Sequence, residues 1–233
     1  MTDPDYGETW TYESLVGALP GVDVPRRVAL AVQFGAFEVA TLAVALYYDR
    51  PAAGLAGTVA VLVATVGSVE MLRIARQIRT LPVSESYRRL LFGSNVETVL
   101  AVLAYVALVT YLFVFEPPRA STPLVEALLG PDPPVLATYL LLLVLWDVCY
   151  RIGTGWWTSV VALWRSLTQS VDPRTARALV RADVETVGFG LVQLAFLPFV
   201  RDRPVLVAVL VGHVLAVVVV AGAAAAILWT TRT

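Results

Sequence analysis

Residues 89–99 read RLLFGSNVETV, and residues 177–187 read RALVRADVETV. Each stretch leads from arginine into an apolar run, so each predicts the start of a membrane-spanning helix. Their recurrence in register predicts a duplicated membrane hairpin with a carboxylate, Glu97 or Glu185, at the same depth in both copies. Burying a lone acid in hydrocarbon costs about 2.5–3.5 kcal/mol on insertion scales. An acid placed there twice therefore needs a partner, a water path or a function.

The composition of the chain predicts an integral membrane protein. Of its 233 residues, 58% are hydrophobic and only 15% are charged, which is too apolar for a soluble globular protein of this size. The single cysteine, Cys149, excludes an internal disulfide and any cysteine-based zinc or iron–sulfur site. We expect no cofactor, since nothing in the sequence resembles a nucleotide-binding loop. We also expect no nucleic-acid partner, because the arginines lie mainly between apolar segments, where they set topology.

Six segments are long and apolar enough to cross about 30 Å of hydrocarbon as helices. They predict an all-α membrane domain over residues 26–229, built as three hairpins with an internal repeat. The approximate spans are 26–48, 52–78, 89–115, 135–166, 178–200 and 204–229. The acidic segment 1–25 that precedes them lacks the basic and apolar regions of a cleaved signal peptide.

The distribution of arginine predicts the orientation of the bundle. The loops at 49–51, 116–134 and 201–204 hold few arginines, whereas most of the others cluster at the opposite ends of the spans. By the positive-inside rule, both termini and the segment 1–25 are expected in the cytoplasm. The sequence therefore predicts a multi-pass protein of the cell membrane.

Three glutamates are candidates for an ion or substrate pathway. Glu97 and Glu185 lie eight residues after Arg89 and Arg177, or about 12 Å along a helix, and Glu38 belongs to a weaker third copy in the first hairpin. If these carboxylates converge on one axis, they can carry protons or bind cations. The alternative is structural, with each acid paired to a nearby arginine.

The fourth span contains a second candidate group. Asp147 and Arg151 are spaced i,i+4, which is typical of an ion pair within one helix. Gly153-Thr154-Gly155 follows directly, so this long span either breaks there and exposes backbone groups to a ligand, or stays intact and projects from the membrane. His213, in the last span, could relay protons or bind a metal, although a lone histidine more often bridges helices.

Further charged residues close the cytoplasmic end of the bundle. We expect ion pairs among Glu70, Arg73, Arg76 and Arg181, including an i,i+4 pair between Arg181 and Glu185. The spacing of Arg73, Arg76 and Arg79 resembles a voltage-sensor helix, but the positive-inside rule already accounts for it.

The leading hypothesis from these residues is a small transporter or channel for protons or small cations. The alternative is a non-transporting scaffold, sensor or complex subunit whose buried ion pairs are structural. An intramembrane enzyme that uses carboxylates and His213 lacks any supporting motif, so enzymatic activity is not expected. The Gly/Ala-rich last span could contact a second copy of the chain or another membrane protein.

Overall fold

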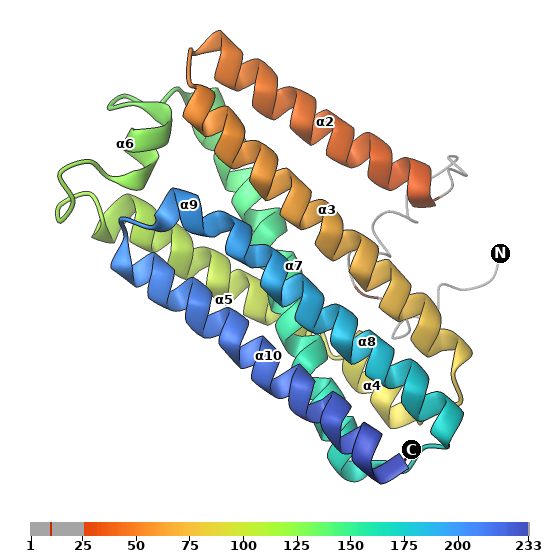
Figure 1. The fold of residues 1–233 in the computed structure, drawn as a ribbon. Helices are drawn as coiled ribbons and strands as arrows, with labels where there is room; N and C mark the ends of the chain where they lie inside the picture. Colours follow the sequence, from red (N-terminus) through yellow and green to blue (C-terminus); the bar gives the residue numbers. More distant parts are fainter. Residues whose placement is uncertain (1–9, 11–25, 233) are drawn as a thin grey trace.

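The structure is a computed structural model that describes Trp10 and residues 26–232. Within these residues the fold is all-helical (Figure 1). Its elements are α2 (Arg26–Tyr47), α3 (Pro51–Thr80), α4 (Glu85–Phe92), α5 (Val96–Thr110), η1 (Tyr111–Phe115), α6 (Leu124–Leu129), α7 (Val135–Thr168), α8 (Pro173–Val192), η2 (Gln193–Phe196), α9 (Leu197–Val200) and α10 (Pro204–Arg232).

Among the described residues, six helical runs are long and apolar enough to cross a membrane, as the sequence predicts. Four of them are the single helices α2, α3, α7 and α10. The third run combines α4, α5 and the π-helical turn η1, and the fifth combines α8, the 3-10 turn η2 and α9. The chain is thus a multi-pass helical protein in which two of the crossings are built from shorter helices.

The two ends of the bundle are distinct (Figure 1). The α2–α3 turn, the α6 segment and the α9–α10 turn lie together at one end, here named the α6 end. The start of α2, helix α4, the α7–α8 turn and the C-terminus lie at the other, here named the α4 end. Helix α2 packs on α3, α5 on α7, and α8 on α10, and α7 contacts all five other spans. α7 is therefore the central helix.

Helix α7 is continuous through Gly153, Thr154 and Gly155, so of the two alternatives left by the sequence the structure has the unbroken helix. Its 34 residues extend for about 51 Å, which exceeds the hydrocarbon thickness. Gly153 instead allows α5 to approach closely. A Cβ on Gly153 would lie 3.0 Å from the backbone nitrogen of Ala101 and 3.2 Å from the carbonyl oxygen of Glu97.

The two similar stretches adopt different backbones. In the first, α4 ends at Phe92, Asn95 takes a left-handed conformation with φ 55°, and α5 begins at Val96. In the second, residues 177–187 lie within the uninterrupted helix α8. The 12 Å helical offset expected between Arg89 and Glu97 is therefore wrong, because the chain turns between them.

Residue Asp172 caps the N-terminus of α8. Its carboxylate accepts hydrogen bonds from the backbone N–H groups of Arg174 and Thr175 and from the hydroxyl of Thr175. These bonds stabilise the charged form, so they hold the pKa of Asp172 below its usual range. The cap and Pro173 at the first helical position together explain why α8 begins here.

Trp10 is completely buried in the core at the α4 end. Its indole N–H donates to the carbonyl oxygen of Leu91 at 3.1 Å, and its ring meets Phe92 edge-on with centroids 4.9 Å apart. The same cluster includes Tyr87 and Leu179. Part of the acidic N-terminal segment thus packs on the bundle, while the remainder of that segment lies outside the described residues.

The close contact at Gly153 gives a test of the packing of α5 on α7. We expect Gly153→Ala to lower the free energy of unfolding by about 1–3 kcal/mol, because the added methyl group meets backbone atoms that cannot rotate away. Gly188→Ala is the matched control, since a Cβ there meets nothing within 4 Å. Thermal unfolding in detergent compares the two, and equal midpoints would contradict this packing.

Candidate functional site

A cavity of about 590 Å³ occupies the half of the bundle nearest the α6 end. All six spans contribute to its wall, and α6 covers it. One broad face of α7 lines it from Ala137 to Ile152, a distance of about 22 Å along the helix. The cavity therefore runs lengthwise beside the central helix.

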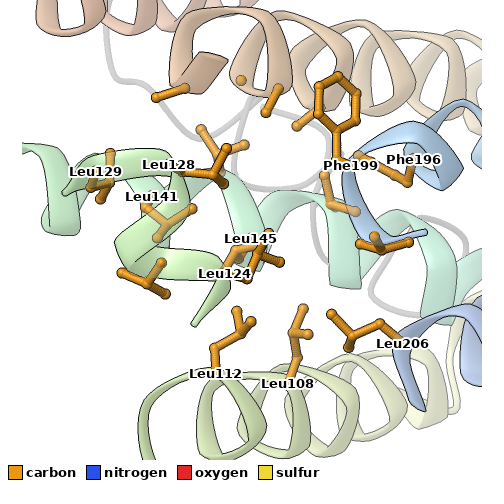
Figure 2. A pocket seen from close by; sticks show the side chains of 18 of the residues that line it. Leu108, Leu112, Leu124, Leu128, Leu129, Leu141, Leu145, Phe196, Phe199 and Leu206 are labelled. Atoms are coloured by element: carbon orange, nitrogen blue, oxygen red, sulfur yellow. The ribbon is translucent and has the colours of Figure 1, made fainter. Parts of the chain in front are cut away.

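The wall of this cavity is almost entirely hydrocarbon. Figure 2 shows Leu108 and Leu112 projecting from one side towards Leu145 of α7, with Phe196 and Phe199 on the opposite side. Among the described residues no aspartate or glutamate lines it. An ion that entered this space would lose its hydration shell and would meet no carboxylate to replace it. An apolar molecule has no such hydration free energy to lose.

A few polar atoms interrupt the apolar wall. Gln193 is only 1% exposed, and within the described part of the chain its side-chain oxygen has no hydrogen-bond partner. The same holds for Nε2 of His213 and for the hydroxyl of Thr41. Cys149 adds a buried thiol. A long apolar space with a small number of unsatisfied polar atoms is typical of a small-molecule site.

Of the six residues predicted to form a pathway, only His213 lines this cavity. Its ring also meets Trp156, with centroids 6.2 Å apart. The glutamates have separate surroundings. Glu38 accepts a hydrogen bond of 2.7 Å from the hydroxyl of Thr58 on α3, and Glu185 pairs with Arg73 on α3 at 2.9 Å.

Glu97 differs from the other predicted acids in the surroundings of its carboxylate. It is fully buried, and neither carboxylate oxygen has a hydrogen-bond or ion-pair partner among the residues that the structure describes. Its backbone carbonyl lies against Gly153 of α7. This side chain is thus placed where α5 and α7 touch, outside the apolar cavity.

The remaining predicted pair lies within α7. Nη2 of Arg151 donates to Oδ1 of Asp147 at 2.8 Å, which confirms the expected i,i+4 ion pair. The Arg151 side chain is fully buried, and its guanidinium lies 5.6 Å from the ring centre of Tyr150. Phe189 of α8 and Gly67 of α3 pack beside it. These surroundings favour a structural role for the pair.

The charged residues expected at the cytoplasmic end have different partners from those predicted. Glu185 pairs with Arg73 across helices, while Arg181 is exposed, so the expected Arg181–Glu185 pair is replaced.

The other two residues expected at that end have partners within the bundle. Arg76 donates to the carbonyl oxygen of Leu72 in its own helix. Glu70 is buried beside Thr186 of α8.

Sequence reasoning missed the most deeply buried ion pair of the described residues, which joins α7 to α8. Arg165 donates from Nη2 to Asp183 at 2.7 Å and from Nη1 to the hydroxyl of Tyr87 on α4 at 3.2 Å. All three side chains are buried. Asp183 stands in the repeated stretch at the position of Asn95, and this recurrent polar residue was the available signal.

A second missed pair closes the α6 end. Nε of Arg203 lies 2.6 Å from Oε1 of the buried Glu116, and Nη2 of Arg203 donates to the carbonyl oxygen of Thr122. Across the described residues, no group of three or more metal-ligating side chains is present. The buried charges are therefore mostly paired in ways that hold helices together. Glu97 differs, because neither of its carboxylate oxygens has a hydrogen-bond partner among the described residues.

The Arg165–Asp183 pair gives a second prediction. Arg165→Met should lower the free energy of unfolding by about 3–5 kcal/mol, because it leaves Asp183 charged and unpaired in the core. Adding Asp183→Leu should recover most of that loss. Arg89→Met, which removes an exposed pair with Glu85, should change stability by less than about 1 kcal/mol. Equal unfolding midpoints for the single and double variants would contradict the pairing.

Comparison with known proteins gives one finding that bears on this site. No curated protein and no solved structure matches the chain. A family model described as a family of unknown function, DUF7530, matches residues 5–224. Because this match covers nearly the whole sequence, including every helix that lines the cavity, the protein belongs to this family of unknown function.

Proposed function

We propose that the protein is a non-transporting component of the cell membrane that binds one long apolar molecule in the cavity beside α7. Its buried ion pairs then hold the six spans in place around that cavity. The observation that carries the proposal is the cavity itself, which is lined mainly by leucine, valine and alanine and by no acid of the described residues.

The size and shape of the cavity support binding of a chain-like molecule. Its volume of about 590 Å³ falls within the range of small-molecule sites, about 300–1,000 Å³. Its long axis follows α7 for about 22 Å, so an extended chain matches it better than a compact one. Because the wall is apolar, a membrane lipid or another lipid-soluble molecule can exchange lipid contacts for protein contacts at little cost in solvation.

The paired charges support a structural role for most of the predicted pathway. Asp147, Glu185 and Asp183 each contact an arginine, and Glu38 accepts a hydrogen bond from Thr58. An arginine partner stabilises the charged acid and opposes the protonation changes that proton transfer requires. This favours the hypothesis of a scaffold, sensor or complex subunit over that of a transporter.

We also propose an orientation of the bundle in the membrane and a surface for a protein partner. The α6 end faces the outside, since most arginines cluster at the α4 end. The two similar stretches then reflect a duplicated hairpin whose copies have diverged at Asn95. On α10, a Cβ at Gly212 or Gly222 would meet nothing within 4 Å, which leaves a smooth strip for a second copy or another membrane protein.

Transport of protons or small cations is the second candidate, because one observation favours it. Glu97 is fully buried and has no partner among the described residues, so its carboxylate is available to a proton or a cation. Transport would require a polar path that reaches this residue from both sides of the membrane.

Filling the cavity gives a direct test of the proposed binding. Ala104 lines the cavity, whereas Val106 on the same helix is 54% exposed and does not line it. We expect the wild-type protein, purified in mild detergent, to retain one lipid-sized molecule in native mass spectrometry. Ala104→Phe should lose at least about tenfold in retention, because its ring occupies the space.

Val106→Phe is the control, and it should retain the molecule as the wild type does. Both variants should unfold at temperatures close to that of the wild type. Retention that is unaffected by Ala104→Phe would mean that the bound molecule lies elsewhere.

Flux measurements separate the two candidates. Liposomes that contain the wild-type protein should show proton and cation flux no greater than protein-free liposomes, under either polarity of gradient, and Glu97→Gln should match them. Flux from the wild type that Glu97→Gln abolishes, in a variant that still folds, would replace binding by transport as the function.

A further inference from the structure

Arg50 lies at the α6 end of the cavity and forms part of its wall. It directly precedes α3, and its guanidinium reaches across to Gly130, the residue that ends α6. A Cβ on Gly130 would lie 2.3 Å from Nη2 and 2.7 Å from Cζ of Arg50. Gly130 has φ 92°, so glycine is favoured there by its backbone as well as by this contact. The guanidinium is thus held beside the mouth of the cavity.

The charge of Arg50 is not balanced by any described residue. Its side chain is half-buried and forms neither a hydrogen bond nor an ion pair within the part of the chain that the structure describes. Arg203, at the same end, has Glu116 as its partner. Asp49 is exposed and does not line the cavity. A partly desolvated cation with no counterion is a favourable place for an anion.

The remainder of the cavity matches one hydrocarbon chain. It extends for about 22 Å along α7, while half of a bilayer's hydrocarbon core is about 15 Å thick. A chain that begins at Arg50 therefore has room to run to the level of Cys149 and Gln193. Tyr48 and Tyr111 also line the cavity, and each carries a hydroxyl group that can bind a polar headgroup.

We infer that the bound molecule is a membrane phospholipid with a net anionic headgroup, whose phosphate pairs with Arg50 and one of whose chains fills the cavity. Arginine presents a planar set of N–H donors that matches phosphate oxygens. This inference rests on the proposed function, because it assigns the ligand of the same cavity.

The test compares two lipids that differ only in the headgroup. The full-length protein is stripped of lipid in detergent, mixed with dioleoyl phosphatidylglycerol or dioleoyl phosphatidylcholine, and analysed by native mass spectrometry. The wild type should retain the anionic lipid about tenfold better. Arg50→Gln should lose this preference, because both lipids then meet a neutral side chain. An unfolding temperature close to that of the wild type would show that the variant is folded.

Arg201→Gln is the matched control, since Arg201 is exposed at the same end of the bundle and lies outside the cavity wall. It should keep the preference of the wild type. A preference for phosphatidylglycerol that survives Arg50→Gln would overturn the inference.

Three further outcomes distinguish the inference from the proposed function. If the wild type retains both lipids equally and Ala104→Phe releases both, the cavity binds lipid but Arg50 does not select the headgroup, and the inference fails alone. If the wild type retains neither lipid, the proposed function fails as well. If added palmitate displaces phosphatidylglycerol in an Arg50-dependent manner, the ligand is a free carboxylate amphiphile, and the assignment to a phospholipid is wrong.

Discussion

The buried ion pair between Arg165 and Asp183 is the interaction on which the rest of the bundle depends. It joins the central helix α7 to α8, and the hydroxyl of Tyr87 adds α4 to the same network. A buried charge is tolerated only when its partner is correctly placed, so this network fixes the register of three helices at the α4 end. Around it, Trp10 and Leu179 form an apolar core.

Fixing the helices at one end has a consequence at the other. All the remaining spans pack on α7, and towards the α6 end they leave a space beside it that side chains do not fill. Helix α6 covers this space, and the Arg203–Glu116 pair closes the adjoining loops. The α4 end thus contains the Arg165–Asp183 network, whereas the α6 end contains the apolar cavity that we propose as the binding site.

Features that depend on local composition and spacing could be predicted from the sequence. Contacts between residues that are far apart in the sequence could not. Six apolar spans follow from segment length, and the Asp147–Arg151 pair follows from i,i+4 spacing. The break before Val96 was missed because the repeated stretch was treated as one continuous helix, although Gly93 and Asn95 are residues typical of a helix boundary. The pairs of Asp183 and Glu185 cross between helices, and no spacing along the chain reveals them. The cavity is a gap between six spans, so only their relative placement could show it.

A density map of the protein in nanodiscs made with lipids of its own membrane would show directly whether the cavity holds a lipid. We expect one elongated density along the face of α7 between Ala137 and Ile152, with its polar end at Arg50 and with no chain of water molecules at Glu97. An empty or water-filled cavity, together with a hydrated path that reaches Glu97 from both ends of the bundle, would contradict this expectation.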